Sequence, residues 1–223
     1  MIPFVRTILL VLAGLYLAAC LALYFAQSRL LFPTWLVGPA GPLPPGAERL
    51  TLDTPDGTRL EGVNLPPLQG AGNDTLILSF AGNATNAQDL AMRLRSAFPE
   101  HPIAAFHYRG YGPSTGTAAA AAMAEDAPLA FDHVVARYRP QRVVALGVSL
   151  GSGVAPTLAA RRSLSGLILV TPFDSLKNVA RQIYWWVPVS LLMKHDLDSA
   201  AALAGSSVPA AIIAAERDEL VRP

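Results

Sequence analysis

The chain has 223 residues, of which 52% are hydrophobic, and a formal net charge of +1. This length is enough for one domain with a substantial core. The near-zero charge gives no electrostatic basis for binding nucleic acid, so we expect no such partner. The single cysteine, Cys20, excludes an intramolecular disulfide and any metal site built on cysteines.

The N-terminal region contains a long apolar run. Residues 8–26 are 19 consecutive positions without a charge, between Arg6 and Arg29. As a helix, this run would be roughly 28 Å long, about the thickness of bilayer hydrocarbon. A core helix is rarely apolar on every face over such a length. We therefore predict that residues 1–27 form a membrane anchor. Residues 8–26 would contact the lipid bilayer, as the single pass of a bacterial inner-membrane protein.

A second interpretation of the same region is a lipoprotein signal. Residues 17–20 read LAAC, which resembles the lipobox of bacterial lipoproteins and would place a lipid on Cys20. Residues 21–26 stay apolar, however, whereas a processed lipoprotein normally continues with polar residues. The side of the membrane that holds the rest of the chain stays open, because Arg6 and Arg29 favour opposite orientations.

Residues 28–47 form a linker rich in proline and glycine. Positions 30–46 include five prolines and three glycines. Proline fixes φ and lacks a backbone donor, so this stretch predicts an extended spacer outside any sheet. We expect its apolar side chains to lie at the membrane interface. These side chains are Leu31, Phe32, Trp35, Leu36 and Val37.

Residues 48–223 show the pattern of an α/β domain. Strands are predicted at 49–54, 58–65, 75–80, 103–108, 143–148, 166–171 and 210–215. Helices are predicted after Asn86 and at 118–139, 152–160 and 175–203, the last broken at Pro188. The first two strands read as a hairpin. The later strands are apolar and alternate with helices, which predicts a mostly parallel sheet covered on both faces.

The motif that indicates chemistry lies at residues 147–151, which read GVSLG. A strand precedes it and a helix of small residues follows, which is the context of a nucleophile elbow. In such a turn Ser149 stands above the sheet edge, and the first N–H groups of the helix point at its target. The alternative is a glycine-rich turn that contains a serine by chance, and the context favours the elbow.

Four stretches together resemble one known family. Residues 80–86 (FAGNATN) resemble an H-G-N-A-x-N oxyanion loop, and residues 108–114 (YRGYGPS) resemble a Y-R-G-Y-G-x-S segment. The elbow is the third stretch, and residues 216–223 (ERDELVRP) resemble the segment that carries the acid of a catalytic triad. From about residue 48 to its end, the chain resembles the α/β-hydrolase family. The likeness is to its membrane-anchored serine-hydrolase branch, which is related to the serine aminopeptidases.

The resemblance implies a role for each residue that matches the family's motifs. Ser149 is the nucleophile, Leu150 and Asn83 supply the oxyanion donors, and Asp218 is the acid that orients the base. Asn83 also suits a turn, and the two roles are compatible. Ala81 stands where the family usually has a histidine that supports the loop, so we expect a less rigid loop.

The catalytic base is the missing part. In the family the histidine follows the acid, but no histidine follows Asp218. His195 is the residue considered as a substitute base, although we expect it to be a solvated surface residue. Asp174 is the alternative acid, and we prefer its interpretation as a helix N-cap. We expect a chain truncated before the catalytic histidine, lacking the fold's last strand and helix, which leaves 210–215 as an exposed edge.

The sequence thus predicts a membrane-anchored serine hydrolase. It would cleave esters, thioesters or amides of a small-molecule or acylated substrate through an acyl-enzyme on Ser149, without a cofactor. The apolar stretch 184–193 either roofs the site and favours a lipophilic acyl group or packs as an ordinary helix. The alternative function is a non-catalytic, membrane-tethered binding protein that has the fold but no base. No spacing of ligands or glycines indicates metal or nucleotide chemistry.

Overall fold

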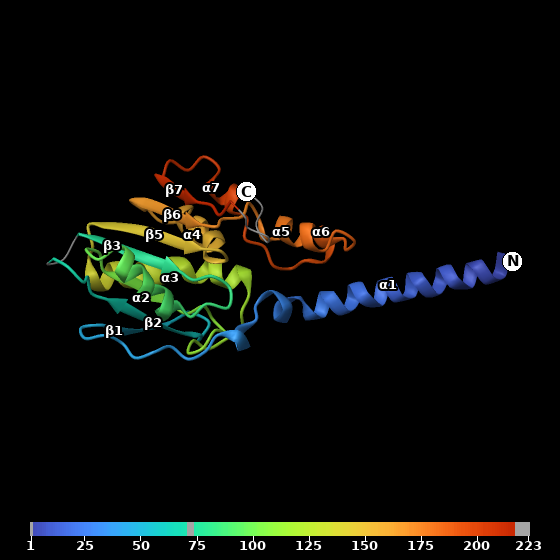
Figure 1. Ribbon diagram of the computed structural model, residues 1–223, viewed down its shortest axis with the longest axis horizontal. Coiled ribbons are helices and arrows are strands. Elements are labelled where there is room, and N and C mark those ends of the chain that lie inside the picture. Colours follow the sequence, from blue (N-terminus) through green and yellow to red (C-terminus); the bar gives the residue numbers. More distant parts are fainter. Residues whose placement is uncertain (1, 71–73, 217–223) are drawn as a thin grey trace.

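The computed structural model describes residues 2–70 and 74–216. A long helix, α1 (Ile2–Leu31), projects from an α/β domain (Figure 1). Among the described residues, it is the only helix long and apolar enough to cross a membrane. The helix continues to Leu31, four residues beyond the predicted end of the anchor at residue 27.

The described strands form one seven-stranded sheet in the order β1-β2-β4-β3-β5-β6-β7. Their bounds are β1 Glu48–Asp53, β2 Arg59–Leu65, β3 Thr75–Phe80, β4 Ile103–Phe106, β5 Arg142–Val148, β6 Gly166–Val170 and β7 Ala210–Ile213. β1 and β2 form the expected hairpin, β2 runs antiparallel to β4, and every other pair is parallel. The predicted mostly parallel α/β sheet is confirmed.

The helices cover this sheet. They are α2 (Ala87–Ala97), α3 (Ala120–Tyr138), α4 (Gly151–Ala159), α5 (Leu176–Ile183), α6 (Val189–Leu192) and α7 (Ser199–Leu203), with a 3₁₀ turn at Thr34–Leu36. α2 packs on β2, β3 and β4, whereas α4 packs on β3, β5, β6 and α3. All six residues of β3 are buried, as expected for a central strand that is covered on both faces. At the other extreme, all four residues of the edge strand β7 are exposed.

The stretch predicted as one helix with a break, residues 175–203, is instead three short helices. Ser175 and Asp198 pair as an isolated antiparallel bridge, which closes residues 175–198 into a loop-like unit that we call the cap segment. Pro188 is the N-cap of α6, and α5 already ends at Ile183. Proline cannot continue a helix from the preceding turn, so the apolar pattern around it does not extend α5.

The linker is less separate from the domain than predicted. Phe32 is only 2% exposed and belongs to the hydrophobic core, and Leu31 and Val37 pack against that core. The expected position of Phe32 at the membrane interface is therefore wrong. Trp35 and Leu36, in contrast, are 58% and 63% exposed. Burying a phenylalanine contributes about 1.5–3 kcal/mol, which fixes the end of α1 to the α/β domain.

Candidate active site

Ser149 lies in the turn between the end of β5 and the start of α4. Its φ is +48°, in the left-handed region that non-glycine residues seldom adopt. The Ser149 N–H donates to the Val170 carbonyl on β6 at 2.9 Å, and the Ser149 carbonyl accepts from the Ser152 N–H at 2.8 Å. Such a conformation costs on the order of 1–3 kcal/mol and persists because its surroundings impose it. It places the serine at the carboxyl edge of the parallel strands.

Three glycines make this turn possible. A Cβ added to Gly147 would lie 2.2 Å from the Gly151 carbonyl oxygen, and one added to Gly151 would lie 2.1 Å from the Phe80 carbonyl oxygen. A Cβ on Gly153 would lie 2.6 Å from the Phe173 ring. Real Cβ atoms do not approach other atoms so closely. The strand, the turn and the first turn of α4 are therefore packed backbone against backbone.

The loop after β3 lies directly beside Ser149. A Cβ added to Gly82 would be 3.5 Å from the Ser149 Cβ. The next residue, Asn83, has both ends of its side-chain amide engaged. Its Nδ2 donates to the Leu31 carbonyl at 2.6 Å, and its Oδ1 accepts from the Tyr111 hydroxyl at 2.6 Å. The Asn83 side chain thus joins the end of α1 to this loop and is not free to bind a ligand.

The backbone N–H groups of Asn83 and Leu150 remain as donors. Within the described residues, neither N–H has a hydrogen-bond acceptor. Leu150 itself is only 4% exposed. Unpaired N–H groups near a serine are the kind of donor that stabilises a negative oxygen during acyl transfer, and this role of the two groups stays a prediction. The sequence pointed to these two residues, and the structure assigns the Asn83 side chain a separate, structural contact.

Two tyrosines that the sequence reasoning did not single out support this loop. The Tyr108 hydroxyl donates to the Ala81 carbonyl at 2.9 Å, and the rings of Tyr108 and Tyr111 meet edge to face at 5.9 Å. Burial raises the pKa of both hydroxyls, so they stay protonated and remain donors. They hold the loop at the position where the family's histidine is replaced by Ala81. Both lie in the YRGYG stretch, which was the available signal.

Arg109, from the same stretch, fixes the connection between β4 and α3. Its guanidinium binds both carboxylate oxygens of the buried Asp126, at 2.8 and 2.5 Å, and Asp56 at 2.7 Å. Hydrogen bonds to Asp126, the largest contribution, and to Asp56 raise the pKa of Arg109 above its ordinary value. This ion-pair cluster is structural, since none of its three members contacts Ser149.

The predicted acids have different outcomes. Asp218 lies outside the described residues, and its role stays a prediction. Asp174 accepts from the Ser175 N–H at 2.6 Å and from the Asn178 side-chain amide. The N-cap of α5 is Ser175, whose hydroxyl accepts from the Asn178 N–H at 3.2 Å. The preferred interpretation of Asp174 as the N-cap is therefore wrong by one residue.

His195 is not the solvated residue that the sequence suggested. It is 8% exposed, its Nε2 lies 2.7 Å from the Ser28 hydroxyl, and its ring meets Phe32 edge to face at 5.1 Å. Burial, and then the charge of Lys194, lower its pKa. The cap segment packs on the end of α1, and this long-range contact buries the ring. His195 thus joins the cap segment to α1.

No described histidine hydrogen-bonds to Ser149. His107 follows β4 and is 3% exposed, and its Nδ1 is buried without a partner among the described residues. Burial lowers the pKa of His107 to about 4, so the ring is neutral at physiological pH. Within residues 2–70 and 74–216, no three His, Cys, Asp or Glu side chains are close enough to hold a metal ion.

Comparison with known proteins places this geometry in a family. No family model matches the sequence. The uncharacterized protein Rv2307c of Mycobacterium tuberculosis is 31% identical over 99% of this chain and 78% of its own length. The Pyrococcus furiosus esterase Pf2001 superposes with a TM-score of 0.66 at 17% identity, over 82% of this chain and 77% of its own. The chain belongs to the α/β-hydrolase family.

Other relatives of this α/β-hydrolase differ in how much of it they match. XC6422 of Xanthomonas campestris, described as an α/β serine hydrolase without a lid, has a TM-score of 0.60 at 20% identity, over 82% of this chain and 78% of its own. The uncharacterized membrane protein YNL320W of Saccharomyces cerevisiae is 27% identical over 90% of this chain and 75% of its length. The mouse lysophosphatidylserine lipase ABHD12 is 34% identical over 50% of this chain and 30% of its length.

Proposed function

We propose that this α/β-hydrolase is a membrane-anchored serine hydrolase in which Ser149 attacks an ester, thioester or amide carbonyl. The observation that supports it is the left-handed Ser149 between β5 and α4, with the unpaired N–H groups of Leu150 and Asn83 beside it. These features are those expected of a nucleophile elbow with an oxyanion hole, and they support the proposal. The esterases and the lipase among its similar proteins support the same reaction class.

The proposed reaction has two steps. The Ser149 Oγ bonds to the carbonyl carbon, and the negative oxygen that forms accepts hydrogen bonds from the N–H groups of Leu150 and Asn83. The bond to the leaving alcohol, thiol or amine then breaks, which leaves an acyl group on Ser149. Water hydrolyses this ester and restores the serine. Each oxyanion donor is expected to contribute about 10²–10³ in rate.

The attack also needs a base that takes the Ser149 proton. Asp218 would orient a histidine for this task, but none of the four histidines of this chain follows Asp218 or hydrogen-bonds to Ser149 in the described part. A positioned base contributes about 10²–10⁴ in rate. Turnover is therefore expected to depend on a base that the described residues do not place at Ser149, and added imidazole should accelerate the hydrolysis of activated esters. The alternative function is a non-catalytic binding protein, and the experiment must distinguish it from a hydrolase.

The membrane part of the proposal is supported by α1. Its 30 residues are about 45 Å long, more than the hydrocarbon thickness, and the helix is apolar and almost wholly exposed. The yeast relative is described as a membrane protein. A single pass through a bacterial inner membrane fits one such helix. The helix runs without interruption through Cys20, the position of the lipoprotein alternative.

The proposal is tested with the purified protein in detergent micelles and a fluorophosphonate probe, which bonds covalently to activated serines. We expect labelling that Ser149→Ala abolishes and that Ser163→Ala, a change of an exposed serine in the same domain, leaves intact. Hydrolysis of 4-nitrophenyl butyrate should show the same dependence and should rise with imidazole. Labelling that survives Ser149→Ala, or no labelling and no turnover with or without imidazole, favours the non-catalytic alternative.

A further inference from the structure

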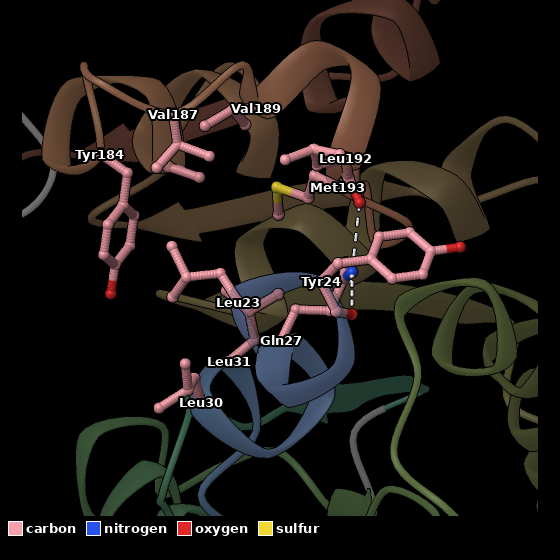
Figure 2. A pocket seen from close by; sticks show the side chains of 11 residues that line it. Leu23, Tyr24, Gln27, Leu30, Leu31, Tyr184, Val187, Val189, Leu192 and Met193 are labelled. Atoms are coloured by element: carbon pink, nitrogen blue, oxygen red, sulfur yellow. Dashed lines mark hydrogen bonds between the residues drawn. The ribbon is translucent and has the colours of Figure 1, made fainter. Parts of the chain in front are cut away.

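An apolar groove runs between the C-terminal half of α1 and the cap segment (Figure 2). Leu23, Leu30 and Leu31 form one wall, and Val187, Leu192 and Met193 form the other. The space between them is about 90 Å³. Pockets that enclose a small ligand typically hold about 300–1,000 Å³, so this is a shallow, open groove and not an enclosed pocket. Such a groove can hold only a short stretch of a lipid chain lying along it.

The walls offer a ligand almost no hydrogen bonds. Gln27 is the one amide side chain in the lining, and its Nε2 already donates to the carbonyls of Tyr24, at 2.7 Å, and Leu192, at 3.2 Å. The Gln27 Oε1 accepts from the Lys194 N–H at 2.7 Å. A peptide or a sugar in this groove would lose its hydrogen bonds to water without replacement. The chemistry of the walls suits a hydrocarbon chain.

One end of the groove lies at the depth of the proposed membrane span. The Tyr16 hydroxyl donates to the Trp186 carbonyl at 3.1 Å, and the two rings meet at 6.4 Å. Tyr16 is in the middle of the charge-free run, about 16 Å along the helix from Gln27. In the cap segment, Trp185 and Leu191 are 82% and 84% exposed. Exposed apolar surface of this kind suits contact with lipid rather than water.

One residue of the groove, Leu31, also contacts the loop beside Ser149. Leu31 lines the groove, and its carbonyl accepts the hydrogen bond from Asn83. Gly82, the neighbour of Asn83, approaches the Ser149 side chain. Lys194 lies near the rim with its Nζ 3.8 Å from the centre of the Tyr24 ring, at a level where lipid headgroups would be. Leu31 thus lies between the groove and the serine's loop, and Ser149 itself does not line the groove.

We propose that this groove binds one acyl chain of a membrane lipid and directs its ester carbonyl to Ser149. The inference rests on the proposed function, because it takes α1 as the membrane span and Ser149 as the nucleophile. The acyl carbon forms a bond to the Ser149 Oγ while its bond to the alcohol oxygen breaks, and that oxygen takes up the proton that the Ser149 hydroxyl loses. Water then releases the fatty acid. The alcohol part of the lipid leaves on the side of the rim.

The test measures binding and turnover separately. Vesicles of phosphatidylcholine carrying one diazirine-labelled hexadecanoyl chain are combined with the membrane-inserted protein, illuminated, and the cross-linked peptides are mapped. Leu192→Trp fills the groove, and Leu191→Trp places the same ring on the neighbouring, outward-facing position. We expect Leu192→Trp to lower cross-linking of the Val187–Met193 region about tenfold and Leu191→Trp to change it by less than about twofold.

Turnover gives a second, independent comparison. We expect Leu192→Trp to lower Ser149-dependent hydrolysis of 4-nitrophenyl palmitate about tenfold and to leave that of the butyrate ester within about twofold. Equal effects of the two tryptophans on cross-linking, or cross-links confined to the outer side of α1, would overturn the acyl site. The cross-linking result is judged separately from turnover. If cross-linking behaves as expected but the protein shows no Ser149-dependent turnover, the acyl-binding groove is supported and the proposed hydrolase activity is refuted.

Discussion

The close packing around Ser149 gives the sharpest stability prediction. In Gly147→Ala, the new Cβ would lie 2.2 Å from the Gly151 carbonyl oxygen, 2.6 Å from its carbonyl carbon and 2.8 Å from the Ser152 Cα. All three are backbone atoms, so no side chain can rotate away. Overpacking costs about 1–3 kcal/mol, and more where the backbone must move. We expect at least about 3 kcal/mol, which lowers the melting temperature by about 6–12 °C in a domain of this size.

Gly166→Ala on the neighbouring strand β6 is the matched control. The nearest atom to its added Cβ is 3.6 Å away, an ordinary contact, so this variant should be unchanged or about 0.4–1 kcal/mol more stable. Both melting temperatures are measured by circular dichroism in the same detergent. Fluorophosphonate labelling should fall with Gly147→Ala and persist with Gly166→Ala. If the two variants melt within about 2 °C of each other, the argument that this turn excludes side chains is refuted.

Three further predictions concern polar side chains at different depths in the domain. Burial lowers the pKa of His107 to about 4, below its unfolded value of about 6.5. Stability should therefore fall by up to about 3 kcal/mol as the pH drops from 6.5 to 4, and urea titrations of His107→Gln should show a flatter slope. Asn83→Ala leaves the Leu31 carbonyl and the Tyr111 hydroxyl without their partner. It should lower the free energy of unfolding, measured in urea, by about 1–3 kcal/mol, whereas Tyr111→Phe should lower it by about 1 kcal/mol. Ser28→Ala, which removes the hydrogen bond to His195, should cost about 1 kcal/mol and lower the melting temperature by about 2–4 °C.

The fold was predictable because the residue types of its central strands reflect burial on both faces of the sheet. β3 and β5 lie between parallel neighbours under helices, so nearly every position is apolar. The cap segment offers no such constraint. Its apolar run around Trp185 and Pro188 reads as a broken helix, but the bridge from Ser175 to Asp198 and the contact with Tyr16 decide its path. These are long-range contacts that no local pattern encodes.

In the candidate site, too, the local turn was predictable from the sequence and the long-range contacts were not. The turn at Ser149 is predictable because it requires glycines at fixed positions around the serine. The contact of Asn83 with Leu31 and that of His195 with Ser28 join residues 52 and 167 positions apart. Both arise because the end of α1 packs against the loop after β3 and against the cap segment, whereas the proline-rich sequence after α1 indicated a detached spacer. The misplacement of Phe32 has the same origin.

The docking of α1 makes the proposed anchor part of the domain. Its last turn contributes the Leu31 carbonyl to Asn83 and the Ser28 hydroxyl to His195, and Phe32, directly after the helix, belongs to the core. Deletion of residues 1–22 leaves all of these contacts, whereas deletion of residues 1–32 removes them. Loss of a buried phenylalanine alone costs about 3–5 kcal/mol. The longer deletion should therefore unfold at a clearly lower urea concentration than the shorter one. Equal midpoints would mean that α1 is a tether and that the groove beside it has no fixed relation to Ser149.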